Sequence, residues 1–188
     1  EPLYSKLHVL DATKKWIADP HTAYLHNFLP AGNVSRPSIV SLMSGIYDAQ
    51  LELNEMESFW KAQTLTSFAG QMKKLGYRTL YWYGGNASNG NFNHFGLAQG
   101  FDEVHSATDF CGDHAPRTWV GVYDHVFLEK AAQLIKESKE PTFHFVYTTS
   151  NHGPYKIPAE VLQVDADAML KDTEADIRDD EERRKAFS

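Results

Sequence analysis

Apolar residues recur along the chain at two spacings, one typical of helices and the other of strands. Residues 37–44, 64–75 and 123–138 carry apolar side chains three or four positions apart, which predicts three amphipathic helices. Residues 77–83 and 142–148 are short aromatic and β-branched runs, and they predict buried strands. Glycine directly follows the first two helical segments and ends them.

The order of these elements predicts an α/β fold. A helix, a short turn, a buried strand and a loop occur twice in succession, which is typical of α/β units around a parallel sheet. Ligands of such sheets bind at the carboxyl ends of the strands. The loops after Tyr83 and Tyr147 are therefore the first places to look for a site.

Composition and charge narrow the class of protein. The 188 residues, 42% of them hydrophobic, suffice for one domain with a buried core, and the net charge of −7 argues against a nucleic-acid partner. The single cysteine, Cys111, excludes an internal disulfide and a multi-cysteine zinc site. No run approaches the roughly 18–20 apolar residues of a membrane span. We expect one domain over 1–188, with a charged tail at 160–188 that is helical or, alternatively, disordered.

The first candidate site is the polar segment that enters the helix at residues 37–44. Ser35 stands just before this helix, where unpaired backbone N–H groups and the helix dipole favour an anion and would help a hydroxyl attack a phosphate or sulfate ester. Arg36 adds a positive charge. The alternative is an ordinary helix cap, in which Ser35 or Ser38 satisfies the N–H groups.

The second candidate site is the polar segment 148–155, directly after the second strand. His152 in this segment could donate a hydrogen bond to an ester oxygen or protonate a leaving group. The alternative is a turn built from asparagine, glycine and proline with a bystander histidine.

A third polar segment, 84–94, is rich in glycine and asparagine and follows the first strand. Its amides could bind a polar head group, and the alternative is a flexible loop. It lacks the Gly-Lys-Ser/Thr ending of a phosphate-binding loop.

Taken together, these segments resemble a known family. Ser35-Arg36-Pro37-Ser38, followed by Leu42-Met43-Ser44-Gly45-Ile46-Tyr47, resembles the sulfatase signature of Cys or Ser, any residue, Pro, Ser and Arg before a helix that ends in Thr/Ser-Gly-x-Tyr. Later segments resemble the lipoteichoic acid synthase and phosphoglycerol transferase branch of the alkaline phosphatase superfamily; they are 75–79, 83–85, 100–103, 119–124 and 149–155. The resemblance runs over residues 24–158, which we therefore expect to be the core of one partial sulfatase-like catalytic domain.

The resemblance implies a three-layer α/β/α sandwich with a mainly parallel sheet, and a metal-dependent nucleophile that attacks a phosphate or sulfate ester. By position, Ser35 is the nucleophile and a metal ligand, and His152 contacts the transferred group. The ester belongs to a glycan or a lipid head group, and the ion is Mn²⁺, Mg²⁺, Ca²⁺ or Zn²⁺. The residues expected around the substrate are Asn33, Arg36, Trp119, Asp124 and Asn151.

The chain departs from the family pattern in two respects. Ile39 stands where the sulfatase signature has arginine, which favours a direct serine nucleophile and a phosphoester over a formylglycine and a sulfate. An early strand ending in an acid and a late Asp-His pair are not evident, so we expect the other metal ligands outside this chain and a catalytic domain truncated at both ends. The alternative function is a non-catalytic module that binds a glycan, a lipid head group or a protein partner.

The resemblance also implies a location. Synthase-like relatives hold this domain on the extracytoplasmic face of a bacterial membrane or in the periplasm. We therefore expect the same location for the full-length protein.

Overall fold

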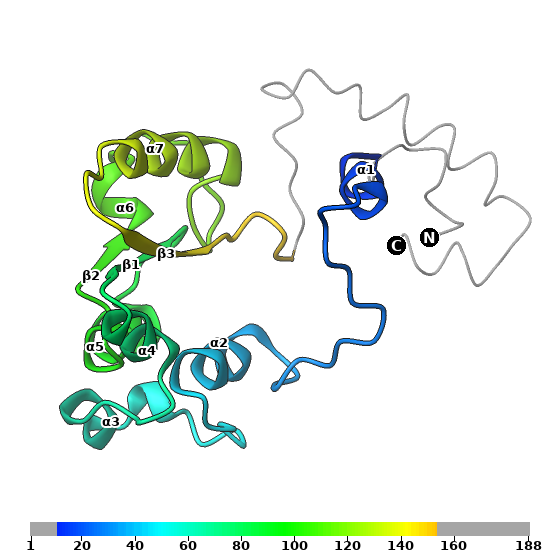
Figure 1. Ribbon diagram of the computed structural model, residues 1–188. Helices are drawn as coiled ribbons and strands as arrows, with labels where there is room; N and C mark the ends of the chain where they lie inside the picture. The colour runs from blue at the N-terminus through cyan, green and yellow to red at the C-terminus, as the bar shows by residue number, and fades with distance from the viewer. Residues whose placement is uncertain (1–10, 154–188) are drawn as a thin grey trace, which may run out of the picture. The chain divides into compact units, whose positions relative to one another are not determined.

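The computed structural model describes residues 11–153 of the chain (Figure 1). The chain divides into two units, and the sheet lies in the unit that spans residues 29–156. The other unit contributes α1 (Asp11–Ala18), an exposed helix. The charged tail expected at 160–188 lies outside the described residues. None of the helices within residues 11–153 is both long and apolar enough to cross a membrane.

Three parallel strands form the centre of the larger unit. In the order of the sheet they are β2 (Glu103–Ser106), β1 (Arg78–Tyr83) and β3 (Thr142–Tyr147). The central strand pairs in parallel with both neighbours, and the register sets Tyr83 beside Ser106 on one side and beside Tyr147 on the other. The three strands therefore end at the same level, and the loops that leave them begin at one edge of the sheet.

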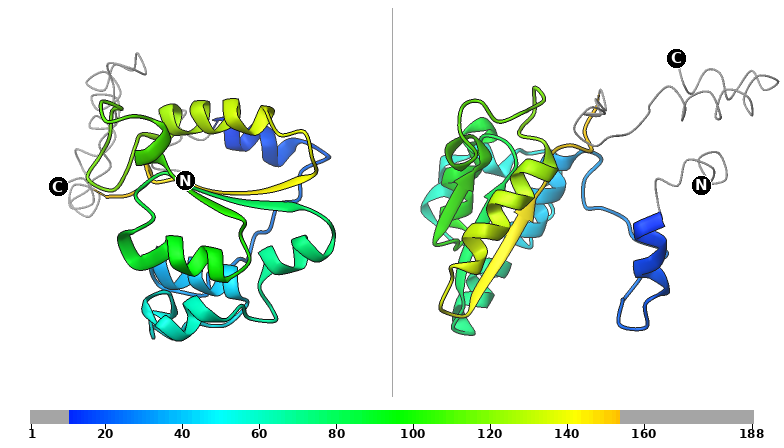
Figure 2. Two further views of the ribbon diagram at one scale, coloured as in Figure 1. Left: turned by 90° about the vertical axis from the view of Figure 1, so that its left-hand side faces the viewer. Right: turned by 90° about the horizontal axis from the view of Figure 1, so that it is seen from above.

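Helices cover both faces of this sheet, as Figures 1 and 2 show. One face carries α2 (Ser35–Ser44), α3 (Glu57–Lys61), α4 (Phe68–Lys74) and α5 (Phe92–Ala98), with the short 3-10 helices η2 (Leu53–Glu55) and η3 (Asn89–Asn91). The other face carries α6 (Ala107–Phe110) and α7 (Asp124–Lys136). This arrangement is the predicted three-layer α/β/α sandwich with a parallel sheet.

Successive residues of β1 enter two separate cores, because side chains alternate between the faces of a strand. Tyr81 and Tyr83 pack among the helices of one face, with Val40, Met43, Phe95 and Phe101. Leu80 and Trp82 pack on the other face, with Val122, Phe127 and Ala131. Because β1 is buried on both faces, its last four residues, 80–83, are all apolar or aromatic, which explains the run that predicted the strand.

The helix predicted at residues 37–44 is α2, and it begins two residues earlier, at Ser35. The residue at the cap position is Val34, which has no side-chain capping bond. The hydroxyl of Ser38 accepts a hydrogen bond from the N–H of Gly32 at 3.1 Å and ties the preceding loop to the first turn. Gly45 ends the helix with a left-handed φ of 70°, as its glycine predicted.

The helix predicted over residues 64–75 is α4, which begins four residues later than expected. Ser67 caps it, because its hydroxyl accepts a hydrogen bond from the N–H of Gly70 at 3.2 Å. The hydroxyls of Thr64 and Thr66 donate to the last carbonyl of α2, at 2.7 and 2.6 Å. Residues 64–67 are therefore held by side-chain hydrogen bonds to α2 and do not form a first turn of α4.

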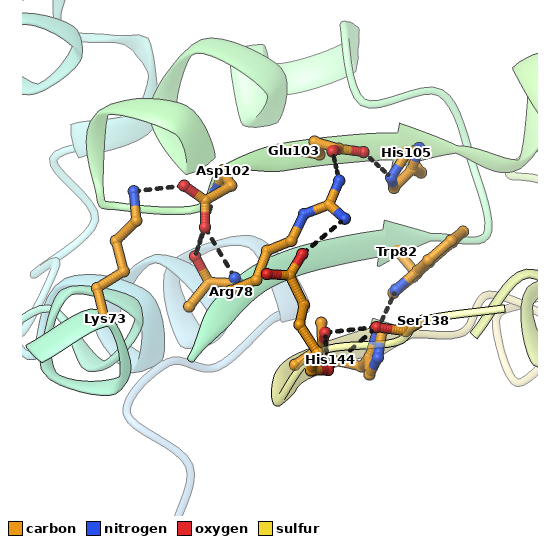
Figure 3. Close-up of polar contacts among 11 residues, drawn as sticks. Lys73, Arg78, Trp82, Asp102, Glu103, His105, Ser138 and His144 are labelled. Carbon is orange, nitrogen blue, oxygen red and sulfur yellow. Dashed lines mark hydrogen bonds and ion pairs between the residues drawn. The ribbon is translucent and has the colours of Figure 1, made fainter. Parts of the chain in front are cut away.

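Charged side chains join the three strands near their amino-terminal ends (Figure 3). The guanidinium of Arg78, at the start of β1, contacts the carboxylate of Glu103 at the start of β2 and that of Glu140 just before β3. Deeper in the sheet, the indole N–H of Trp82 donates to Nδ1 of His144 at 3.0 Å. These contacts connect each outer strand to the central one through side chains as well as the backbone.

A second polar cluster holds the loop before β2. The carboxylate of Asp102 accepts hydrogen bonds from the N–H and hydroxyl of Thr79, at 2.9 and 3.0 Å, and lies 2.7 Å from Nζ of Lys73 (Figure 3). Partial burial raises the pKa of Asp102, but the hydrogen bonds from Lys73 and Thr79 outweigh it and lower the pKa below its ordinary value.

This lowered pKa makes stability depend on pH. Because the carboxylate of Asp102 is favoured in the folded state, it stabilises the fold above about pH 4, the ordinary pKa of Asp, and this contribution is lost as pH falls through the lower folded value. We expect Asp102→Asn to lower the free energy of unfolding at neutral pH and to weaken its acid dependence, measured by urea unfolding. Glu57→Gln, at an exposed pair with Lys61, is the control and should change little. An unchanged acid dependence in Asp102→Asn would contradict this role.

Candidate functional site

A pocket of about 690 Å³ opens where the strands end. The start of α2, the segment after β1, the segment before α7 and the loop after β3 all contribute to its wall. Its polar lining consists of Ser35, Arg36, Asn89 and His152, and its aromatic lining of Tyr83, Phe92, Trp119 and Tyr147. The pocket thus combines an anion-attracting set of groups with several aromatic rings.

Glycine backbone allows these segments to meet. The N–H of Gly84 donates to the carbonyl of Tyr147 at 2.8 Å, and its own carbonyl accepts from the N–H of Val122 at 2.9 Å. A Cβ on Gly121 would overlap the carbonyl oxygen of Gly84, and a Cβ on Gly85 would lie 2.7 Å from the carbonyl oxygen of Val120. No side chain fits between these backbones, so the sequence needs glycine here.

Ser35 occupies the first position of α2 and is exposed at the pocket. The first N–H groups of a helix have no partner within it and carry the positive end of the helix dipole. The cap residue Val34 supplies no side-chain acceptor to them. A negatively charged group next to Ser35 would therefore be stabilised by the helix terminus.

Arg36 adds a guanidinium to the same wall. Its Nη1 lies 3.6 Å from a carboxylate oxygen of Glu52 and 3.6 Å from one of Glu55. Glu55 also accepts a hydrogen bond from the side-chain amide of Asn91. The two carboxylates hold the guanidinium in place and reduce its net charge, although half-exposed pairs of this kind are weak.

His152 and Trp119 form the opposite part of the pocket. Nδ1 of His152 donates to the carbonyl of Gly153 at 2.8 Å, and the indole N–H of Trp119 donates to the same carbonyl at 3.2 Å. The two rings meet edge to face, with centroids 5.2 Å apart. Because a carbonyl oxygen only accepts, Nδ1 of His152 carries the proton of this hydrogen bond. Nε2 is then free to contact a substrate, and it donates a hydrogen bond when the ring is an imidazolium.

Asp124, expected on the substrate side, is not among the residues that line the pocket. Its Oδ1 accepts the backbone N–H groups of Thr149 and Ser150, at 2.9 and 3.0 Å, and its own N–H donates to the hydroxyl of Ser150 at 2.7 Å. Asp124 is the first residue of α7, so these bonds fasten the loop that carries His152 to the helix.

The two expected asparagines also lie apart from the pocket lining. Asn33 lines a separate hollow of about 330 Å³ with Gly32, Pro37 and Tyr47. Asn151 is exposed in the loop after β3. Of the residues expected around the substrate, Arg36 and Trp119 are therefore the two that share the pocket with Ser35 and His152.

Of the four aromatic residues that line the pocket, the sequence pointed to Trp119 and not to Tyr83, Phe92 or Tyr147. The rings of Tyr83 and Tyr147 stack with centroids 5.0 Å apart and an interplanar angle of 10°. These are the last residues of two adjacent strands that pair in register. Their position at the carboxyl ends of strands could have indicated that they line a site. The aromatic run around each of them indicated instead that they belong to the core.

The described residues alone do not fit the divalent ion that the sequence resemblance implies. Within residues 11–153 no three His, Cys, Asp or Glu side chains converge into a group that could hold a metal. Next to Ser35 in the pocket stand one imidazole and a guanidinium, and the latter repels a cation.

Comparison with known proteins identifies the family of this chain. The family model described as Sulfatase matches residues 12–183 of the chain. The chain belongs to the sulfatase family. The match includes the start of α2 and the loop after β3, the two segments that carry Ser35 and His152.

Two solved structures share the fold of this chain. A protein of the alkaline phosphatase superfamily from Vibrio parahaemolyticus matches with a TM-score of 0.51 and 25% identity, over 64% of this chain and 30% of its own. The lipoteichoic acid synthase LtaP from Listeria monocytogenes matches with a TM-score of 0.62 and 18% identity, over 82% of this chain and 43% of its own. The chain spans less than half the length of either protein.

The contacts of Asp124 predict a measurable effect on the fold. Asp124→Ala leaves the N–H groups of Thr149 and Ser150 without their acceptor, so we expect the free energy of unfolding to fall by about 1–3 kcal/mol. Asp124→Asn keeps an oxygen at this position and should lose less. Chemical denaturation of the three proteins measures the difference. Equal stability of the alanine variant and the wild type would show that the loop is held by other contacts.

Proposed function

We propose that the protein cleaves a phosphate or sulfate ester, with Ser35 as the nucleophile and His152 as the contact to the transferred group. The observation that carries this proposal is the shared pocket: Ser35, Arg36 and His152 come from opposite ends of the described chain and line one cavity. Membership of the sulfatase family supports the same reaction class.

The proposed chemistry is an exchange at phosphorus or sulfur. Oγ of Ser35 forms a bond to the central atom while the bond to the leaving alcohol breaks, and the alcohol departs with the proton that the serine hydroxyl loses. Water or an acceptor alcohol then attacks the serine ester, takes over the transferred group and returns a proton to Ser35. A hydrolase and a transferase differ only in this second acceptor.

The charges around the pocket favour such a reaction. The amino terminus of α2 and the guanidinium of Arg36 both stabilise the negative oxygens of the transferred group. Nε2 of His152, in the imidazolium form, can donate a hydrogen bond to one of these oxygens. Ile39 in place of the signature arginine favours a phosphoester and an unmodified serine.

The resemblance to lipoteichoic acid synthases supports three further parts of the proposal. The ester is one of a glycan or lipid head group, the reaction takes place on the extracytoplasmic side of a membrane, and a divalent ion with ligands beyond residues 11–153 takes part, with Ser35 among its ligands. Residues 11–153 do not by themselves form the site of that ion.

Substitution of Ser35 tests the proposal. In the full-length protein, Ser35→Ala should lower turnover of an aryl phosphate or an aryl sulfate by about 1,000-fold or more, because the attacking atom is lost. Ser35→Thr keeps a hydroxyl and should retain measurable turnover. Ser58→Ala, at an exposed position of α3, is the matched control and should behave as the wild type.

Two results would count against this role. Undiminished turnover of both esters by Ser35→Ala would exclude Ser35 as the nucleophile. A wild-type protein that binds the esters but turns over neither would instead support the alternative, a non-catalytic binding module.

A further inference from the structure

Tyr83 is the last residue of the central strand and forms part of the pocket wall beside Ser35, Arg36 and His152. Only 8% of its surface is exposed, so the phenol ring is held firmly among its neighbours. The ring stacks on Tyr147 and meets Phe92 edge to face, with centroids 6.0 Å apart. Its position is therefore fixed by packing before any ligand binds.

The backbone next to Tyr83 adds to this constraint. A Cβ on Gly85 would lie 2.9 Å from Cζ of Tyr83, the carbon that bears the hydroxyl. The glycine pair after β1 thus lets the chain turn directly against the phenol.

Tyr81 provides an internal comparison. It precedes Tyr83 by two residues, projects to the same face of β1, and lies with its ring centroid 6.2 Å from that of Tyr83. Tyr81 is fully buried, and its hydroxyl is sealed in the core without a partner among residues 11–153. An unpaired hydroxyl alone therefore does not indicate a ligand-binding site. Tyr83 differs from Tyr81 because it lines a cavity.

The hydroxyl of Tyr83 also lacks a hydrogen-bond partner in the part of the chain that the structure describes. Unlike the hydroxyl of Tyr81, it is not completely enclosed by protein atoms. Buried tyrosine hydroxyls usually find a partner. Tyr83 lines the same pocket as Ser35 and Arg36. A hydrogen-bond acceptor that enters the pocket would supply the missing partner.

The protonation state of Tyr83 suits a donor. Burial raises the pKa of Tyr83, the neighbouring Tyr147 raises it further, and Arg36 opposes the shift only in part. The phenol therefore stays protonated at neutral pH, so a residue that lines the pocket keeps an O–H group that can donate. Arg36, on the same wall, brings anionic groups toward this O–H.

We propose that Tyr83 is a substrate-contacting residue, whose hydroxyl donates a hydrogen bond to a charged oxygen of the ester beside Arg36. This inference rests on the proposed function and extends it. It assigns a direct contact to the end of the central strand, where the sequence pattern indicates only core.

The test compares Tyr83→Phe with Tyr81→Phe in the full-length protein. Each variant removes one hydroxyl and keeps the ring, so both should fold, which thermal unfolding checks. Loss of a hydrogen bond to a charged group should lower kcat/KM for an aryl phosphate by about 10- to 100-fold in Tyr83→Phe and raise the inhibition constant of inorganic phosphate by a similar factor. Tyr81→Phe should leave both quantities unchanged.

The outcomes separate this inference from the proposed function. Wild-type values of kcat/KM and of the phosphate inhibition constant in Tyr83→Phe would overturn the contact, and so would an equal loss in Tyr81→Phe. Neither result bears on Ser35. Conversely, full turnover by Ser35→Ala would overturn the nucleophile, while weaker phosphate inhibition in Tyr83→Phe would still support the contact.

Discussion

The parallel pairing of β1 with both of its neighbours is the constraint on which the candidate site depends. Because the register sets Tyr83 beside Tyr147, the two strands end together and their following segments leave from one edge. Gly84, Gly85 and Gly121 then let three backbone segments pack in direct contact. A larger residue at any of these three positions would push the segments apart and disrupt the pocket wall that they form.

Much of this fold could be predicted from the sequence, because the central elements are long and strongly patterned. The strands expected at 77–83 and 142–148 and the helix expected at 123–138 are present, each within two residues of its predicted ends. β2 was not predicted, because its four residues are too few to show an alternation. Its His105 instead stacks on Trp82 of the central strand, with centroids 4.3 Å apart, a contact that only the folded chain reveals.

The candidate site was predictable in its chemistry and less so in its geometry. The motif around Ser35 and the histidine at 152 drew attention to two segments that do share a cavity. The place of Asp124 could not be read from sequence, since its carboxylate binds backbone groups that any residue provides. Tyr83 was overlooked for a similar reason: a tyrosine at a strand end looks the same whether its ring faces a core or a cavity.

If Ser35 attacks the ester from this pocket, a covalent intermediate on its Oγ forms during turnover and can be trapped. The full-length protein would be mixed with an aryl phosphate, quenched in acid during turnover and digested, and its peptides analysed by tandem mass spectrometry. We expect a phosphoryl group on Ser35 that is absent from Ser35→Ala. Turnover with a phosphoryl group on a different residue, or with none on Ser35 at any quench time, would contradict it.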